Sequence, residues 1–114
     1  MTVREIAGAA GFRIINEGQS FDSAAGGPFC CDLLSIAMSR MPEAAVWVTV
    51  MANVNTLAVA SLTDAACVIL AENARLDETC AAKAAEQGIT VLATELPIFE
   101  AALRVYQLLN GPAA

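Results

Sequence analysis

The fold of this chain is decided by residues 44–70, AAVWVTVMANVNTLAVASLTDAACVIL. Two short runs rich in Val, Ile and Ala, residues 45–50 and 66–70, have the continuous apolar pattern of strands buried on both faces of a sheet. The Ala-rich segment 54–61 between them predicts a short helix. A strand, a helix and a second strand in this order form a βαβ unit, whose strands are parallel and whose crossover is right-handed.

The same alternation continues toward the C-terminus. Residues 77–87 predict a helix, with Asp77 as a plausible cap. Residues 89–93 predict another buried strand. Thr94 is expected to cap a final helix that runs to about residue 110.

The first elements are predicted from local signals. Thr2 and Glu5 have the spacing of a capping box, which predicts a short helix that ends at Gly11. Residues 12–16 are β-branched and alternate enough to predict a strand.

A long loop is expected over residues 19–28, which contain Gly, Ser, Asp and Pro, with a short strand near Ala24. Apolar side chains three and four residues apart predict a helix over residues 31–41, which Pro42 stops. The elements together predict an α/β fold: a mostly parallel sheet built from βαβ units, with helices on both faces, in a single compact domain spanning residues 1–114.

Length and composition agree with this fold. The chain has 114 residues, enough for one domain of ordinary size. It is 57% hydrophobic with a mean hydropathy of +0.58, yet no apolar stretch approaches the ~20 residues that span a bilayer. Even the richest run is interrupted by Thr49, Asn53, Asn55 and Thr56. We therefore expect a strongly buried sheet, with surplus apolar surface covered in a homodimer or larger homo-oligomer.

The charge balance limits the partners. Six basic residues against twelve acidic ones give a formal net charge of −6, and the isoelectric point is near 4.3. Nucleic-acid binding requires a basic patch, so this balance disfavours a nucleic-acid partner. The first residues have no charged segment followed by an apolar block, so neither a signal peptide nor a membrane partner is expected. We expect a cytoplasmic protein whose four cysteines remain free thiols.

Short motifs follow one another along nearly the whole chain: Gly26-Gly27, Asp32-Leu33-Leu34-Ser35, Asn55, Ala58-Val59-Ala60-Ser61-Leu62, Val68-Ile69-Leu70, Gly88-Ile89 and Thr94. This ordered set resembles the DRTGG domain of bacteria and archaea. That domain is similar to the N-terminal domain of HPr kinase/phosphorylase and is found elsewhere beside CBS nucleotide-sensing domains. The resemblance implies a regulatory module, because the part of the kinase that it covers is not the catalytic part.

The chain departs from this family at the residues that give it its name. Asp32 is kept, whereas Leu33 stands where Arg is expected, and Ala71, Glu72 and Asn73 stand where Thr-Gly-Gly is expected. Gly allows close backbone approach and Arg makes bidentate contacts, so these changes weaken a grip on phosphate. The chain is interpreted as a divergent, stand-alone member of the family.

The first candidate ligand-binding residues surround the start of the helix predicted over residues 31–41. Gly26 and Gly27 form a flexible loop before it, and a loop running into a helix N-terminus presents backbone donors. Alternatively, the two glycines only permit a tight turn. Asp32 complements the helix dipole or accepts a hydrogen bond from a ligand hydroxyl or amine, with Ser35 on the same turn.

Other candidates follow the carboxyl ends of the predicted strands, where open parallel sheets bind ligands. They are Thr49, Asn53, Asn55, Glu72, Asn73, Thr94 and Glu95. If they converge with the glycine pair and Asp32, they form a polar crevice with little positive charge. Such a crevice favours a neutral or weakly charged ligand, such as an adenosine-like group, over a polyphosphate. Alternatively, Asn53, Asn73 and Thr94 only cap helices.

Catalysis and metal binding find little support in the residue types. The chain has no His and a single lysine, Lys83, so the usual pairs of base and nucleophile are missing, and no P-loop motif is present. Cys30 and Cys31 lack the spacing of zinc ligands, so no metal or cofactor is expected. Near a helix start their thiol pKa would be lowered, which leaves a redox accessory role open beside a structural one.

These observations favour a non-catalytic regulatory module that binds a small polar ligand, adenosine-like or a nucleotide, and self-associates. A pure protein-protein interaction domain is the alternative.

Overall fold

The computed structural model describes residues 1–111 and confirms the alternation of strands and helices. The elements, in chain order, are α1 (Val3–Ala10), β1 (Arg13–Asn16), β2 (Pro28–Cys30), α2 (Leu34–Arg40), β3 (Val46–Thr49), α3 (Val54–Leu62), β4 (Cys67–Leu70), α4 (Glu78–Gln87), β5 (Val91–Ala93) and α5 (Ile98–Asn110). None of the helices in this part of the chain is long and apolar enough to span a membrane.

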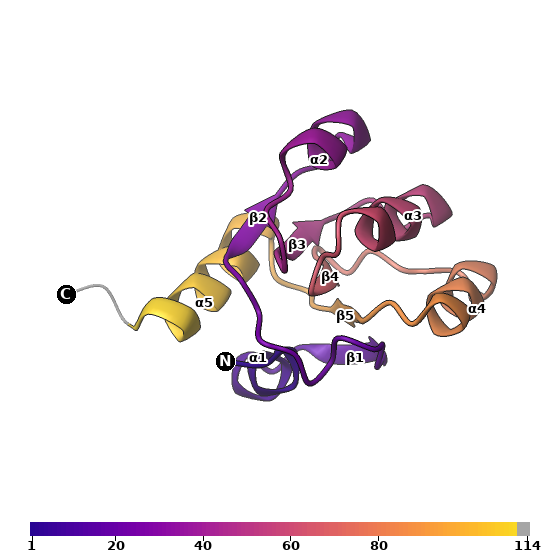
Figure 1. The fold of residues 1–114 in the computed structure, drawn as a ribbon. Coiled ribbons are helices and arrows are strands. Elements are labelled where there is room, and N and C mark those ends of the chain that lie inside the picture. Colours follow the sequence, from indigo (N-terminus) through magenta and orange to yellow (C-terminus); the bar gives the residue numbers. More distant parts are fainter. Residues whose placement is uncertain (112–114) are drawn as a thin grey trace.

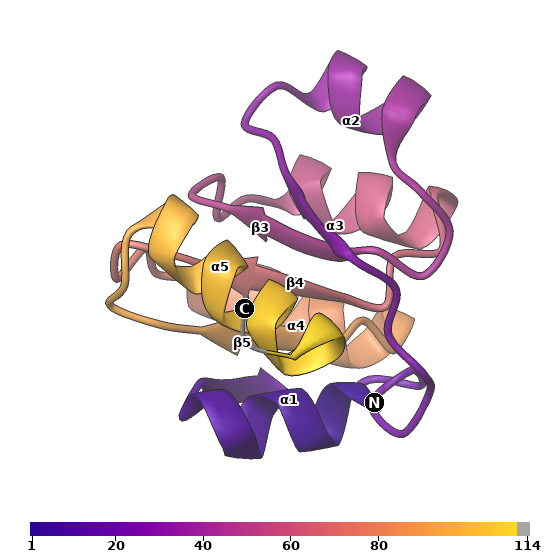
Figure 2. The same ribbon diagram turned by 90° about the vertical axis from the view of Figure 1, so that its left-hand side faces the viewer.

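The strands form one sheet in the order β1-β5-β4-β3-β2. β2, β3, β4 and β5 are parallel neighbours, and β1 is added antiparallel beside β5. Each crossover from β2 to β5 moves one strand in the same direction, so right-handed crossovers place α2, α3 and α4 on one face. α1 and α5 cover the other face (Figures 1 and 2). The predicted α/β class, mostly parallel with helices on both faces, is confirmed.

The central strands β3 and β4 are buried along their whole length. Val46, Val48 and Ile69 pack toward α1 and α5. Trp47 and Val68 point the opposite way, into the cluster formed with α2, α3 and α4. Because both faces are covered, these strands are continuously apolar rather than alternating, which is why the sequence identified them.

Residues 17–27 cross the amino ends of the parallel strands and connect β1 at one edge of the sheet to β2 at the other. The Gly18 N–H donates to a hydroxyl just before β5, and the Ser20 hydroxyl donates to a carbonyl just before β4. The Gly26 N–H donates to a carbonyl before β3, at 2.7 Å. Phe21 is buried beneath this segment and anchors it to the core. The predicted long loop is therefore fixed to each strand start in turn.

Several helix ends follow the sequence signals. Thr2 and Glu5 make the expected capping box, and Gly11 ends α1 in the left-handed conformation, with φ of 73°. The Asp77 carboxylate accepts a hydrogen bond from the Cys80 N–H at 2.8 Å and caps α4.

The expected start of the helix over residues 31–41 is wrong. Its first residues are extended, because the Cys31 N–H continues the pairing of β2 with β3 by donating to a β3 carbonyl at 3.4 Å. The helix begins at Leu34 instead. The strand expected near Ala24 is only an isolated bridge to Thr2, and the strand itself lies at Pro28–Cys30.

The expected cap of the last helix is also wrong, because Pro97 rather than Thr94 stands at the N-cap of α5. The Thr94 hydroxyl accepts a hydrogen bond from the Leu96 N–H at 3.2 Å. The carbonyls of Thr94 and Leu96 accept from the N–H groups of Asn73 and Glu72, at 3.0 and 2.9 Å. These bonds extend the contact of β5 with β4 past the strand ends, and the helix starts only after them.

We expect the close crossing at Gly18 to be essential for stability. A Cβ at Gly18 would overlap the backbone of residues 88–90, so Gly18→Ala should lower the free energy of unfolding by about 1–3 kcal/mol. The matched control is Gly8→Ala in α1, where a Cβ meets no atom within 4 Å. That change should raise the free energy of unfolding by about 0.5–1 kcal/mol. Urea unfolding followed by Trp47 fluorescence measures both, and equal stability of the two variants would contradict the crossing.

Candidate ligand-binding site

The carboxyl ends of β2, β3, β4 and β5 lie along one edge of the sheet. Thr49 pairs with Leu70, and Leu70 pairs with Ala93, so β3, β4 and β5 end level with one another. Most of the sequence candidates follow these ends: Asp32, Thr49, Asn53, Glu72, Asn73, Thr94 and Glu95. The structure thus brings these side chains to a common edge, in a row from β2 to β5.

At the β3 end of this edge, Asp32 is already engaged by the protein. Its Oδ1 accepts from the Thr49 hydroxyl at 2.6 Å and from the Val50 N–H at 3.0 Å. Thr49 is completely buried, so the carboxylate satisfies a hydroxyl that water does not reach. The expectation that Asp32 lies in the first turn of the helix is wrong, because Asp32 precedes α2. Its hydrogen bonds connect the segment between β2 and α2 to the end of β3.

The Asn53 side chain also has a hydrogen-bond partner within the protein, whereas among the described residues the side chains of Asn55 and Ser35 have none. The Asn53 side-chain oxygen accepts from the Thr56 N–H at 3.0 Å, so the interpretation of Asn53 as the cap of α3 is confirmed. Asn55 and Ser35 are exposed on the first turns of α3 and α2. Their side chains are directed to solvent at the same edge.

At the β4 and β5 ends, Glu72 and Asn73 form a turn with left-handed backbone angles, φ 55° and 60°. No helix follows directly, so the interpretation of Asn73 as a helix cap is wrong. The turn is held by the two backbone hydrogen bonds to residues 94 and 96, which leaves the side chains of Glu72, Asn73 and Glu95 exposed.

Gly26 and Gly27 lie at the opposite, amino edge of the sheet. The Gly27 carbonyl accepts from the Val46 N–H at 3.0 Å, and the pair leads into β2 instead of into a helix. The expected arrangement of glycine loop and helix N-terminus is therefore wrong. The alternative of a tight turn is wrong as well, because the chain makes no turn at residues 26–27. Gly26 instead permits a close approach of two backbone segments, since a Cβ there would lie 3.0 Å from the Ala44 carbonyl oxygen.

The environment of the adjacent cysteines differs from the one expected. Cys30 is the last residue of β2 and lies outside α2. Burial, followed by the negative charge of Asp32, raises the pKa of the Cys30 thiol. A helix N-terminus would lower it, so the geometry disfavours a reactive thiolate at Cys30. Across residues 1–111, no three His, Cys, Asp or Glu side chains are grouped to hold a metal ion.

Two hollows adjoin at the β1 side of the carboxyl edge. The first has a volume of about 300 Å³ and is lined by Arg13, Ile15, Leu70, Ala74, Arg75 and Leu76. The second has a volume of about 290 Å³ and is lined by Gly11, Arg13, Ala93, Thr94, Glu95 and Leu96. Arg13 borders both hollows, and two of the sequence candidates, Thr94 and Glu95, line the second.

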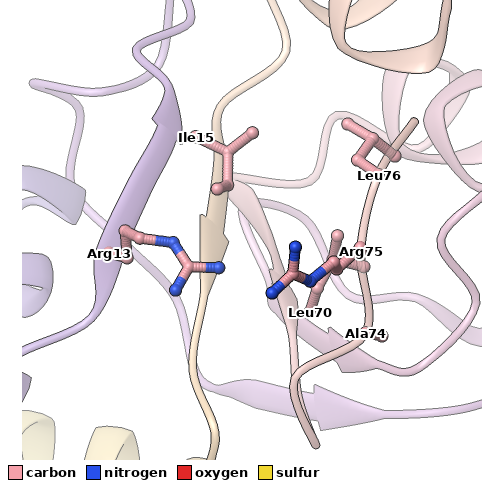
Figure 3. Close-up of a pocket in the computed structure, with 6 residues that line it drawn as sticks. All are labelled: Arg13, Ile15, Leu70, Ala74, Arg75 and Leu76. Carbon is pink, nitrogen blue, oxygen red and sulfur yellow. The ribbon is translucent and has the colours of Figure 1, made fainter. Parts of the chain in front are cut away.

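The sequence patterns did not indicate Arg13 and Arg75. In the first hollow their guanidinium groups point toward one another (Figure 3). Arg13 reaches this edge because β1 runs antiparallel, so the first residue of β1 pairs with Ala93 at the carboxyl end of β5. A parallel strand would have placed it at the amino edge instead. The direction of β1 is set by tertiary pairing, so no local signal could have located Arg13.

This arrangement defines a small α/β domain with a partly basic hollow beside the carboxyl ends of its parallel strands. No protein-family model and no curated protein matches the sequence. The structure is similar to the crystal structure of the CBS and DRTGG domains of the regulatory region of Clostridium perfringens pyrophosphatase, complexed with its activator diadenosine tetraphosphate. The TM-score is 0.73 at 14% sequence identity, covering 93% of this chain and 46% of that chain. This chain therefore spans about half of that structure, and the likeness establishes a related fold.

Proposed function

We propose that the chain is a divergent, stand-alone member of the DRTGG family and acts as a regulatory module that binds a small polar ligand, adenosine-like or a nucleotide. The hollow at the carboxyl edge, between β1 and the segment after β4, is the observation that carries this proposal. The related fold belongs to a regulatory region that binds a nucleotide activator, which supports the same class of role.

The turn after β4 supports the family assignment. Glu72 and Asn73 stand where the family is expected to have two glycines, and both have positive φ. Residues other than Gly adopt this conformation rarely, so the backbone keeps a shape that Gly favours although both glycines are absent. The turn also positions the residues that follow it, which line the hollow.

We place the ligand at the β4 and β5 end of the edge. There the ligand occupies the first hollow, with Thr94 and Glu95 in the adjoining second hollow and Glu72 and Asn73 exposed nearby. At the β2 and β3 end, Asp32 is hydrogen-bonded to Thr49, and Asn53 caps α3. These side chains are therefore less available to a ligand, and we do not place the ligand beside them or beside Asn55 and Ser35.

A non-catalytic role agrees with the chemistry of the hollow. The ionisable side chains that line the first hollow are Arg13 and Arg75, and arginine is protonated at all physiological pH values, so neither acts as a general base. The four cysteines are free thiols, which suits the reducing cytoplasm where we propose that the module acts.

We expect isothermal titration calorimetry to detect binding of at least one of three probes: adenosine, adenosine monophosphate and diadenosine tetraphosphate. Ala74→Leu should weaken that binding by about tenfold or more, because the larger side chain would fill part of the hollow. Ala58→Leu, at an exposed position of α3, is the matched control and should bind like the unmodified protein. No binding of any probe, or an equal effect of both substitutions, would contradict the proposal.

We further propose that the chain forms a homodimer. Phe99, Leu103 and Tyr106 form an apolar stripe along α5 and are exposed, Phe99 by 71%. Their spacing of four and three residues places them on one side of the helix, next to the side that covers the sheet. A second copy of the chain is the partner that would cover this stripe.

We expect sedimentation equilibrium at roughly tens of micromolar to give about twice the monomer mass of 11.8 kDa. Phe99→Glu should shift the protein to monomer, since it puts a charge into the apolar contact. Ala58→Glu adds the same charge at an exposed position of α3, on the opposite face of the sheet, and should leave the dimer intact. A monomer at all these concentrations would rule out the dimer.

A further inference from the structure

We infer that the hollow between β1 and residues 74–76 binds the phosphate group of a small phosphate monoester. This inference rests on the proposed function, because it names the class of ligand for the same site. It is carried by the two guanidinium groups that face one another across the hollow (Figure 3).

Neither arginine of the hollow is paired within residues 1–111. The same holds for Arg40 and Lys83, but neither of those lines the hollow, and the other two basic residues are engaged. Arg4 is paired with Asp22 at 2.7 Å, and Arg104 donates to a backbone carbonyl at 3.0 Å. Within residues 1–111, Arg13 and Arg75 take part in no salt bridge and no side-chain hydrogen bond, although acidic residues outnumber basic ones two to one, twelve to six. Two facing cations repel one another, and an anion held between them would remove that repulsion.

The geometry suits a dianion better than a single carboxylate. Each guanidinium presents a planar fork of N–H donors that matches two oxygens of a phosphate or carboxylate. A phosphate monoester carries a charge of about −1.5 to −2 at neutral pH and three acceptor oxygens, so it can engage both forks at once. A lone carboxylate has one charge and two oxygens, and it would leave one arginine unsatisfied.

The remaining walls select the rest of the ligand. Ile15, Leu70, Ala74 and Leu76 are apolar, so the group attached to the phosphate has an apolar or aromatic face. A volume of about 300 Å³ is at the lower end of ligand pockets. The site therefore fits a ligand of mononucleotide size or smaller, and not both halves of a dinucleoside polyphosphate.

The backbone at both arginines is fixed before any ligand binds. Arg13 is fixed by the pairing of β1 with β5. Arg75 lies between Asn73, whose N–H donates to residue 94 at 3.0 Å, and Asp77, which caps α4. Because the Asp77 carboxylate occupies the N-terminus of α4, the guanidinium groups rather than helix donors would hold the phosphate.

Glu95 makes the second hollow unfavourable for an anion. It lines the second hollow, which Arg13 also borders, and would repel a phosphate there. The first hollow, which Glu95 does not line, is therefore the better place for an anion.

The test compares adenosine monophosphate, inorganic phosphate and adenosine by calorimetric titration at low salt. We expect the monophosphate to bind about tenfold or more tightly than adenosine. Arg13→Gln and Arg75→Gln should each remove most of that difference while leaving the weaker affinity for adenosine unchanged. Arg40→Gln makes the same charge change on α2, at the other edge of the sheet, and should preserve the preference. Both pocket arginines are exposed and unpaired, so their variants should unfold at the temperature of the unmodified protein, which circular dichroism checks.

The outcomes separate the two proposals. If adenosine binds as tightly as adenosine monophosphate and inorganic phosphate does not bind, the phosphate site is contradicted, whereas the proposal of a ligand-binding module is not. Phosphate binding that is insensitive to both pocket variants, or equally sensitive to Arg40→Gln, would overturn it as well. Failure of adenosine, the monophosphate and diadenosine tetraphosphate alike would overturn both.

Discussion

The parallel pairing of β3 with β4, buried on both faces, is the contact on which the remaining structure depends. Every residue of both strands is buried, so each face must be covered by helices. Successive right-handed crossovers send α2, α3 and α4 to one face, and only α1 and α5 remain for the other. Because α1 must pack there, the chain enters the sheet through β1 at the far edge and returns across the strand starts to β2. The antiparallel direction of β1, and with it the position of Arg13 at the carboxyl edge, follows from this route.

The parts of the fold that could be predicted are those encoded locally. The βαβ unit over residues 44–70 and the caps at Thr2 and Asp77 depend on neighbouring residues, and their boundaries agree with the structure to within one or two residues. β2 could not be predicted, because it is a three-residue strand with pairing on one side only. The prediction that Thr94 caps the last helix was wrong because of a contact distant in sequence. Hydrogen bonds to a turn more than twenty positions earlier in the chain prevail over the local capping preference of Thr94.

The candidate site was predicted in part. The expectation that polar residues after the strands meet at one edge follows from parallel pairing alone, and the structure places them there. Sequence could not reveal that Asp32 is held by Thr49, or that Gly26 and Gly27 lie at the other edge. The net charge does not give the local charge of the hollow. A value of −6 describes the whole chain, whereas two of its six basic side chains border one hollow, and binding depends on the local charge.

The central claim is that a ligand binds between β1 and the segment after β4. Amide-resolved NMR, recorded while adenosine monophosphate is added to the isotope-labelled protein, tests this claim most directly because it locates the site without a substitution. We expect the largest shift changes at Arg13, Ile15 and residues 74–76, with smaller changes at Thr94 and Glu95. Saturable shifts concentrated at Gly26 and Gly27, or on α2, would contradict it.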